Sequence, residues 1–118
     1  MRNTTTFINL DYLRLMADND EEMIQTMLGM LVEELPEELE KINTFFQEKN
    51  WDELHKVSHK MKSTLAFVGN DDLTAANKEI ERLAKEETGP ERIGELIGVL
   101  HNLAPLVLEE LREMAGPI

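Results

Sequence analysis

A chain of 118 residues with 42% hydrophobic content is long enough to bury one core and too apolar for wholesale disorder. Twelve basic against 24 acidic residues give a net charge of −12, which disfavours nucleic acid and anionic membranes as partners. With no cysteine, no signal peptide and no apolar run long enough to span a membrane, we expect a cytoplasmic protein without disulfides or thiolate metal sites.

The first half of the chain predicts an extended segment, a short helix and a long helix. Residues 1–8 are expected to be extended, and a short helix is predicted over 9–17. The next helix, predicted over 20–48, continues its apolar spacing across Pro36, which favours a kink over a break. The acidic run 33–40 is interpreted as a solvated face. The predicted apolar face comprises Met23, Met27, Met30 or Leu31, Leu35, Leu39, Ile42, and Phe45 or Phe46.

Three more helices complete the predicted fold. One begins after Asn50 and ends at Gly69, and the next runs from Asn70 or Asp71 to about residue 87. The last begins at Pro90, is bent by Pro105 and ends near residue 114. No segment alternates like a strand, and short loops join antiparallel helices. We therefore predict an all-α, up-down four-helix bundle with a short extra N-terminal helix, as a single domain over 1–118.

The helix predicted over 50–69 carries a histidine opposite its apolar side. At about 100° per residue, His59 points roughly 160° away from the centre of the apolar arc. The arc consists of Trp51, Leu54, Val57, Met61, Leu65 and Val68. The outward face around His59 carries His55, Lys56, Lys60, Lys62, Ser63 and Ala66.

The side chains around His59 favour a covalently attached anion. The small residues Ser63 and Ala66 leave space for another protein, and Lys62 places a positive charge where an anion on the ring would lie. A neutral imidazole is a nucleophile, but this stretch offers no acid, base or oxyanion group of its own. This set of side chains suits a carrier of a phosphoryl group better than an enzyme. From periodicity alone, an ordinary polar residue on a solvated face would be the favoured interpretation of His59, because exposed histidine is common.

A metal site is a further alternative for the histidines. His55 and His59 are four residues apart and could share an ion. Two imidazoles need additional ligands, however, and the neighbouring lysines would repel a cation. We therefore expect neither a metal nor a cofactor. His101 stands alone in the last helix and is assigned no role.

The sequence around His59 resembles the signature of histidine-containing phosphotransfer (HPt) domains. The family pattern is His, any residue, an apolar residue, Lys and Gly, with a second Gly before the next helix. This chain reads HKMKS from His59, with Ser63 in place of the usual glycine, and Gly69 follows. The similarity extends to NLDYLRLMADNDEEMIQTMLGMLVEELPEELEKI before the histidine and DDLTAANKEIERLAKE after it, so nearly the whole chain is covered.

This resemblance implies a phosphocarrier of a two-component phosphorelay, of the kind found in bacterial signalling, and not an enzyme. By analogy, His59 accepts a phosphoryl group from the phospho-aspartate of a receiver domain and passes it to another receiver. Lys62 would offset the phosphoryl charge, the Ser63 hydroxyl could bond a phosphoryl oxygen, and Glu81 could hold the other ring nitrogen. The implied partners are response-regulator receivers, which supply magnesium and an acidic pocket, and a sensor histidine kinase, in some pathways hybrid.

Docking of a receiver also requires apolar surface beside the histidine. The candidate docking residues are Tyr12, Met16, His55, Lys56, Ala66 and Phe67. A monomer is expected, because one bundle accounts for the apolar positions. The competing function is a helical interaction module that keeps the fold and transfers no phosphate.

Overall fold

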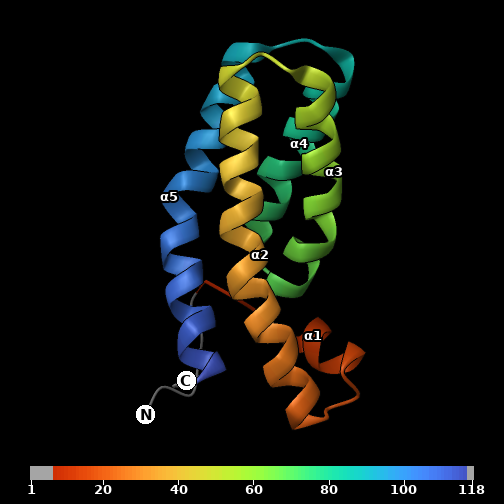
Figure 1. The fold of residues 1–118 in the computed structure, drawn as a ribbon, viewed down its shortest axis with the longest axis vertical. Helices are drawn as coiled ribbons and strands as arrows, with labels where there is room; N and C mark the ends of the chain where they lie inside the picture. The colour runs from red at the N-terminus through yellow and green to blue at the C-terminus, as the bar shows by residue number, and fades with distance from the viewer. Residues whose placement is uncertain (1–6, 117–118) are drawn as a thin grey trace.

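Four long helices form an antiparallel bundle in the computed structural model, which describes residues 7–116 (Figure 1). α2 packs against α3, α3 against α4, α4 against α5, and α5 closes the ring against α2. A short helix, α1, packs against α2 and α3 at one end. The elements are α1 (Asp11–Met16), α2 (Glu21–Gln47), α3 (Trp51–Val68), α4 (Asp71–Glu86) and α5 (Pro90–Ala115). The predicted all-α bundle with a short extra helix is confirmed, while residues 1–6 of the expected extended segment lie outside the described residues.

Local chemistry sets the helix ends close to where the sequence predicts them. Asp20, Asn50 and Asn70 each accept a hydrogen bond from a backbone N–H in the first turn of the helix that follows. Gly69 ends α3 in the left-handed conformation, at φ 72°. Pro90 is the first residue of α5, where its missing N–H costs no hydrogen bond.

α2 continues unbroken through Pro36, as predicted, whereas the kink at this position stays a prediction. The apolar face of its first half differs from the expected one. Met23 is exposed, and Ile24 and Leu28 are buried, while of the two alternatives Met30 and Leu31 it is Leu31 that is buried. A shift of one residue turns a helix face by about 100°, and both phases are apolar here, so packing against the rest of the bundle decides which is buried.

Glu38 corrects the interpretation of the acidic run 33–40 as a solvated face. This carboxylate is only 7% exposed, and its Oε1 atom has no hydrogen-bond partner among residues 7–116. Burial raises the pKa of Glu38 above its ordinary value, although a hydrogen bond with Thr64 of α3 acts in the opposite direction. Glu38 lies on the side of α2 that faces α3, a position that the composition of the run does not reveal.

The segment before α1 is anchored across the end of the bundle. The Asn9 N–H donates to the carbonyl of Val68 at 3.0 Å, and the Asn70 side chain donates to the carbonyl of Phe7 at 2.8 Å. The buried carboxylate of Glu110 accepts the Phe7 N–H at 2.8 Å. These bonds hold α1 beside the last turn of α3. No helix in the described part of the chain is long and apolar enough to cross a membrane.

Candidate functional site

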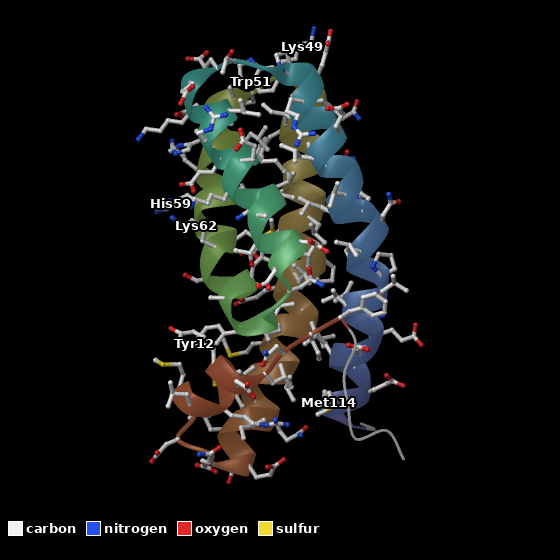
Figure 2. All side chains as sticks on the ribbon, turned by 180° about the vertical axis from the view of Figure 1, so that it is seen from behind. Tyr12, Lys49, Trp51, His59, Lys62 and Met114 are labelled. Atoms are coloured by element: carbon white, nitrogen blue, oxygen red, sulfur yellow. The ribbon has the colours of Figure 1, made fainter. Side chains whose placement is uncertain are left out.

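His59 projects from the outer face of α3 into solvent, with 66% of its side chain exposed (Figure 2). The helix is anchored directly behind it, because Ser58 and Met61 are fully buried. In Figure 2 the side chains of His59 and Lys62 extend from the same face of α3, about half-way along the bundle. The backbone that carries the ring is therefore fixed, while the ring itself is accessible to another protein.

One ring nitrogen of His59 is held by a carboxylate from the neighbouring helix. Glu81, on α4, places Oε2 2.6 Å from His59 Nδ1. Only 16% of the Glu81 side chain is exposed, so the carboxylate lies in the seam between α3 and α4. An ionised carboxylate only accepts hydrogen bonds, which assigns the proton to Nδ1 and leaves Nε2 with a free lone pair.

Glu81 also faces two further basic groups. Its Oε2 lies 3.8 Å from His55 Nε2, and its Oε1 lies 3.7 Å from Lys62 Nζ. Burial by itself would raise the pKa of Glu81, but the hydrogen bond with His59 and the positive charge of Lys62 outweigh it and lower that pKa. The carboxylate is therefore ionised at neutral pH, as its role of acceptor requires.

The remaining predicted site residues lie around the ring, and the ring of His55 tilts against that of His59 with centroids 6.3 Å apart. Ser63 and Ala66 are exposed on α3, on the side of His59 nearer α1. Lys56 is exposed as well, but its ammonium pairs with Asp52 at 3.1 Å on its own helix. His55 is half-buried against Glu81, so it contributes less open surface than its position on the helical wheel indicates.

The expected apolar docking residues lie at the α1 end of the same face. Tyr12 is 45% exposed, and Met16 is 56% exposed. The Tyr12 ring stacks on Phe67, with ring centroids 5.3 Å apart, so α1 extends the apolar surface of α3.

Sequence reasoning missed one further member of this surface. Met30 is exposed and lines a pocket of about 100 Å³ together with Ser63 and Phe67. Met30 and its neighbour Leu31 were both apolar candidates for the buried face of α2, and the sequence did not show which of them is exposed. Flexible methionine side chains adapt to differently shaped partners, which suits a docking surface. We call Tyr12, Met16, Met30 and Phe67 the apolar patch.

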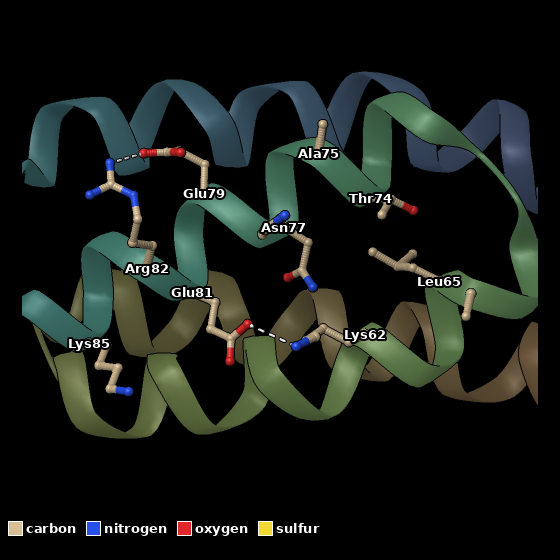
Figure 3. Close-up of a pocket in the computed structure, with 11 residues that line it drawn as sticks. Lys62, Leu65, Thr74, Ala75, Asn77, Glu79, Glu81, Arg82 and Lys85 are labelled. Atoms are coloured by element: carbon tan, nitrogen blue, oxygen red, sulfur yellow. Dashed lines mark hydrogen bonds and ion pairs between the residues drawn. The ribbon is translucent and has the colours of Figure 1, made fainter.

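A basic groove lies on the other side of the site, between α3 and α4 (Figure 3). Its volume is about 680 Å³, and its lining extends from Lys85 past Glu81 and Lys62 to Leu65 and Thr74. Arg82 pairs with Glu79 along α4. The groove is basic in a chain of net charge −12, because its lining includes Lys62, Lys78, Arg82 and Lys85 against Glu79 and Glu81.

The described residues 7–116 contain no cluster of three or more histidine, cysteine, aspartate or glutamate side chains arranged to hold a metal ion. His55, His59 and Glu81 do meet, but as a hydrogen-bonded and ion-paired group. The arrangement offers one exposed nitrogen nucleophile, one carboxylate that orients it and one nearby ammonium group.

A helical bundle with an exposed histidine that a carboxylate of the next helix orients matches the arrangement expected of a histidine phosphotransfer module. The Hpt domain family model matches residues 26–115, and the chain belongs to that family. The crystal structure of the HPT domain from the Hpt sensor hybrid histidine kinase of Shewanella is similar, with a TM-score of 0.67 and 27% identity. The alignment covers 88% of this chain and 92% of that one. No curated protein matches the chain in sequence. Hpt domains are phosphocarriers of phosphorelays and not catalysts.

Proposed function

We propose that this chain receives a phosphoryl group on His59 Nε2 from the phospho-aspartate of a receiver domain and passes it to a second receiver. The observation that carries the proposal is the 2.6 Å contact between His59 Nδ1 and Glu81 Oε2 on an otherwise exposed ring. This contact makes Nε2 the free nucleophile and directs it away from the bundle. A sensor histidine kinase, hybrid or separate, would phosphorylate the first receiver, and this chain would act as a monomer between the two.

The transfer itself needs little from this chain beyond the imidazole. The Nε2 lone pair forms the N–P bond while the bond from phosphorus to the aspartyl oxygen breaks, and the receiver's carboxylate leaves. No proton has to move, because Nδ1 keeps its hydrogen. The ring becomes cationic as the bond forms, and the Glu81 carboxylate stabilises that charge. The reverse sequence delivers the group to the next receiver.

Lys62 has a second part in this proposal. In the unphosphorylated protein its ammonium lies 3.7 Å from Glu81 Oε1. A phosphoryl group on Nε2 brings two negative charges near the same ammonium, which would then turn from Glu81 towards phosphate oxygens. Ser63, exposed one turn after His59, is placed to donate a hydrogen bond to the same group.

The receiver would cover the surface on both sides of His59. The apolar patch and Ala66 provide a hydrophobic contact, and the methionines let different receivers use the same area. The basic groove would attract the acidic surroundings of a receiver's phosphorylation pocket. Magnesium would come with the receiver.

The test is transfer of labelled phosphate from a phosphorylated receiver to the purified chain. We expect label that is stable to base and labile to acid, as a phosphoramidate is. His59→Gln should abolish it, while the matched control His101→Gln, at an exposed histidine of α5, should leave it unchanged.

Label that persists in His59→Gln would contradict the assignment of His59. A chain that binds receivers with normal affinity but takes up no label from any of them would instead be a helical interaction module. Glu81→Gln gives a finer test, because an amide still reaches Nδ1 but no longer carries the charge that stabilises the phosphorylated ring. We expect it to slow uptake without abolishing it.

A further inference from the structure

A buried polar bridge joins α3 to α4 directly behind the phosphoacceptor. Ser58 is 0% exposed, and Asn77 is 1% exposed. The Ser58 hydroxyl donates to Asn77 Oδ1 at 2.6 Å, and Asn77 Nδ2 donates to the backbone carbonyl of Ser58 at 3.0 Å. The Ser58 hydroxyl also lies 3.0 Å from the Asn77 backbone carbonyl, so three hydrogen bonds join the two residues in the seam between α3 and α4.

Each residue of the bridge is close in sequence to one residue of the contact that orients the ring. Ser58 immediately precedes His59 on α3. Asn77 lies four residues before Glu81 on α4, which is about one helical turn along nearly the same face. Any displacement of Asn77 along or around the α4 axis is passed to Glu81 by one rigid turn of helix.

The contact between His59 and Glu81 tolerates little displacement. The contact measures 2.6 Å, and a slide of α4 by one residue rise, about 1.5 Å, would lengthen it to about 3.0 Å if the slide runs across the contact and to about 4.1 Å, beyond hydrogen-bond distance, if it runs along the contact. The apolar residues that α4 buries, such as Leu73 and Ile80, attract α3 and α5 without a preferred direction. Hydrogen bonds in a buried, low-dielectric interface are directional, and breaking one leaves polar atoms unsatisfied.

We propose that the Ser58–Asn77 bridge sets the register of α4 against α3, and so positions Glu81 on His59 Nδ1 and leaves Nε2 directed at the receiver. Ser58 and Asn77 are thus positioning residues for phosphotransfer, an inference that rests on the proposed function. Net stability is a poor explanation for the bridge, because a buried polar pair is often replaceable by apolar residues of similar volume without loss.

The test replaces both partners at once, with Ser58→Ala and Asn77→Leu, so that no buried polar side-chain group is left unpaired. Nitrogen-15 NMR on the unphosphorylated protein reports which ring nitrogen of His59 carries the proton. We expect a folded protein in which the Nδ1–H tautomer loses its predominance, with the rate of phosphoryl uptake lower by about tenfold. The matched control is Ile80→Val, which removes one methylene from the buried face of α4 and should leave tautomer and rate unchanged.

Two results would overturn the inference. One is a double variant that keeps the native tautomer and the native rate of phosphoryl uptake. The other is an Ile80→Val variant whose tautomer and uptake rate change as much as those of the double variant. If the double variant does not fold, Asn77→Leu alone decides, because it removes both hydrogen bonds of the Asn77 side chain and leaves the Ser58 hydroxyl its bond to the backbone carbonyl of residue 77. An unchanged tautomer there equally contradicts the role of the bridge. The tautomer is measured on the unphosphorylated protein and does not depend on phosphotransfer. A native chain that accepts no label would therefore refute the proposed function, while the tautomer would still test the role of the bridge.

Discussion

Substituting Gly69 with alanine tests how the N-terminal segment is attached to the site. Gly69 ends α3 at φ 72°, a conformation that costs an L-residue about 1–2 kcal/mol. A Cβ atom there would lie 2.1 Å from the backbone oxygen of Asn9, where real Cβ contacts stay beyond about 3.0 Å. The Asn9 carbonyl would have to move by about 1 Å, because neither partner is a flexible side chain.

The same movement would disturb the hydrogen bond from the Asn9 N–H to the Val68 carbonyl, now 3.0 Å, which contributes about 1 kcal/mol. We expect Gly69→Ala to lower the free energy of unfolding by about 2–3 kcal/mol in all, or about 10 °C in Tm for a domain of this size. Urea unfolding followed by circular dichroism measures the loss. Because α1 carries Tyr12, affinity for a receiver should fall as well.

Gly89→Ala is the matched control for the steric part of this reasoning. Gly89 is also left-handed, at φ 61°, but a Cβ there would meet only the end of the flexible Leu83 side chain, 3.3 Å away. It should show mainly the conformational cost, about 1–2 kcal/mol. Equal losses of stability for the two variants would refute the argument that Asn9 is packed against Gly69.

Two further predictions concern buried and surface charge. Glu38→Gln should raise the free energy of unfolding by about 1 kcal/mol at pH 7, since it removes a buried charge and keeps an acceptor for Thr64. The raised pKa of Glu38 means that the native state holds the proton to higher pH than the unfolded state, so the wild type loses stability as pH rises above 4.5. The extra stability of Glu38→Gln over the wild type should therefore vanish below that pH. Acid-to-neutral denaturation series on both proteins check this, and a gain that persists at pH 3 would contradict it. Lys78→Glu with Lys85→Glu should slow association with a receiver about tenfold at low salt and flatten its salt dependence. Stopped-flow binding measures this, with Lys41→Glu plus Lys49→Glu, both outside the groove, as the charge-matched control (Figure 2 shows Lys49 at the far end of the bundle); an equal effect of this pair would show that net charge, and not the groove, attracts the receiver.

Much of the fold follows from local signals in the sequence. The side-chain caps at Asp20, Asn50 and Asn70 act within the next turn of helix, and the left-handed end at Gly69 depends on a single residue. The outward direction of His59 also follows from spacing along one helix. These features need no knowledge of neighbouring helices, so the sequence was sufficient to predict them.

The packing of one helix against another could not be predicted from these local signals. The sequence alone determined which helices form and that His59 faces outward, because periodicity and capping act within about one turn of the chain. The tertiary structure decided that Ile24 is buried and Met23 exposed, that Glu38 turns inward, and that Glu81 meets His59 Nδ1. Each of these depends on the register and rotation of one helix against another, which the packing of the whole bundle determines.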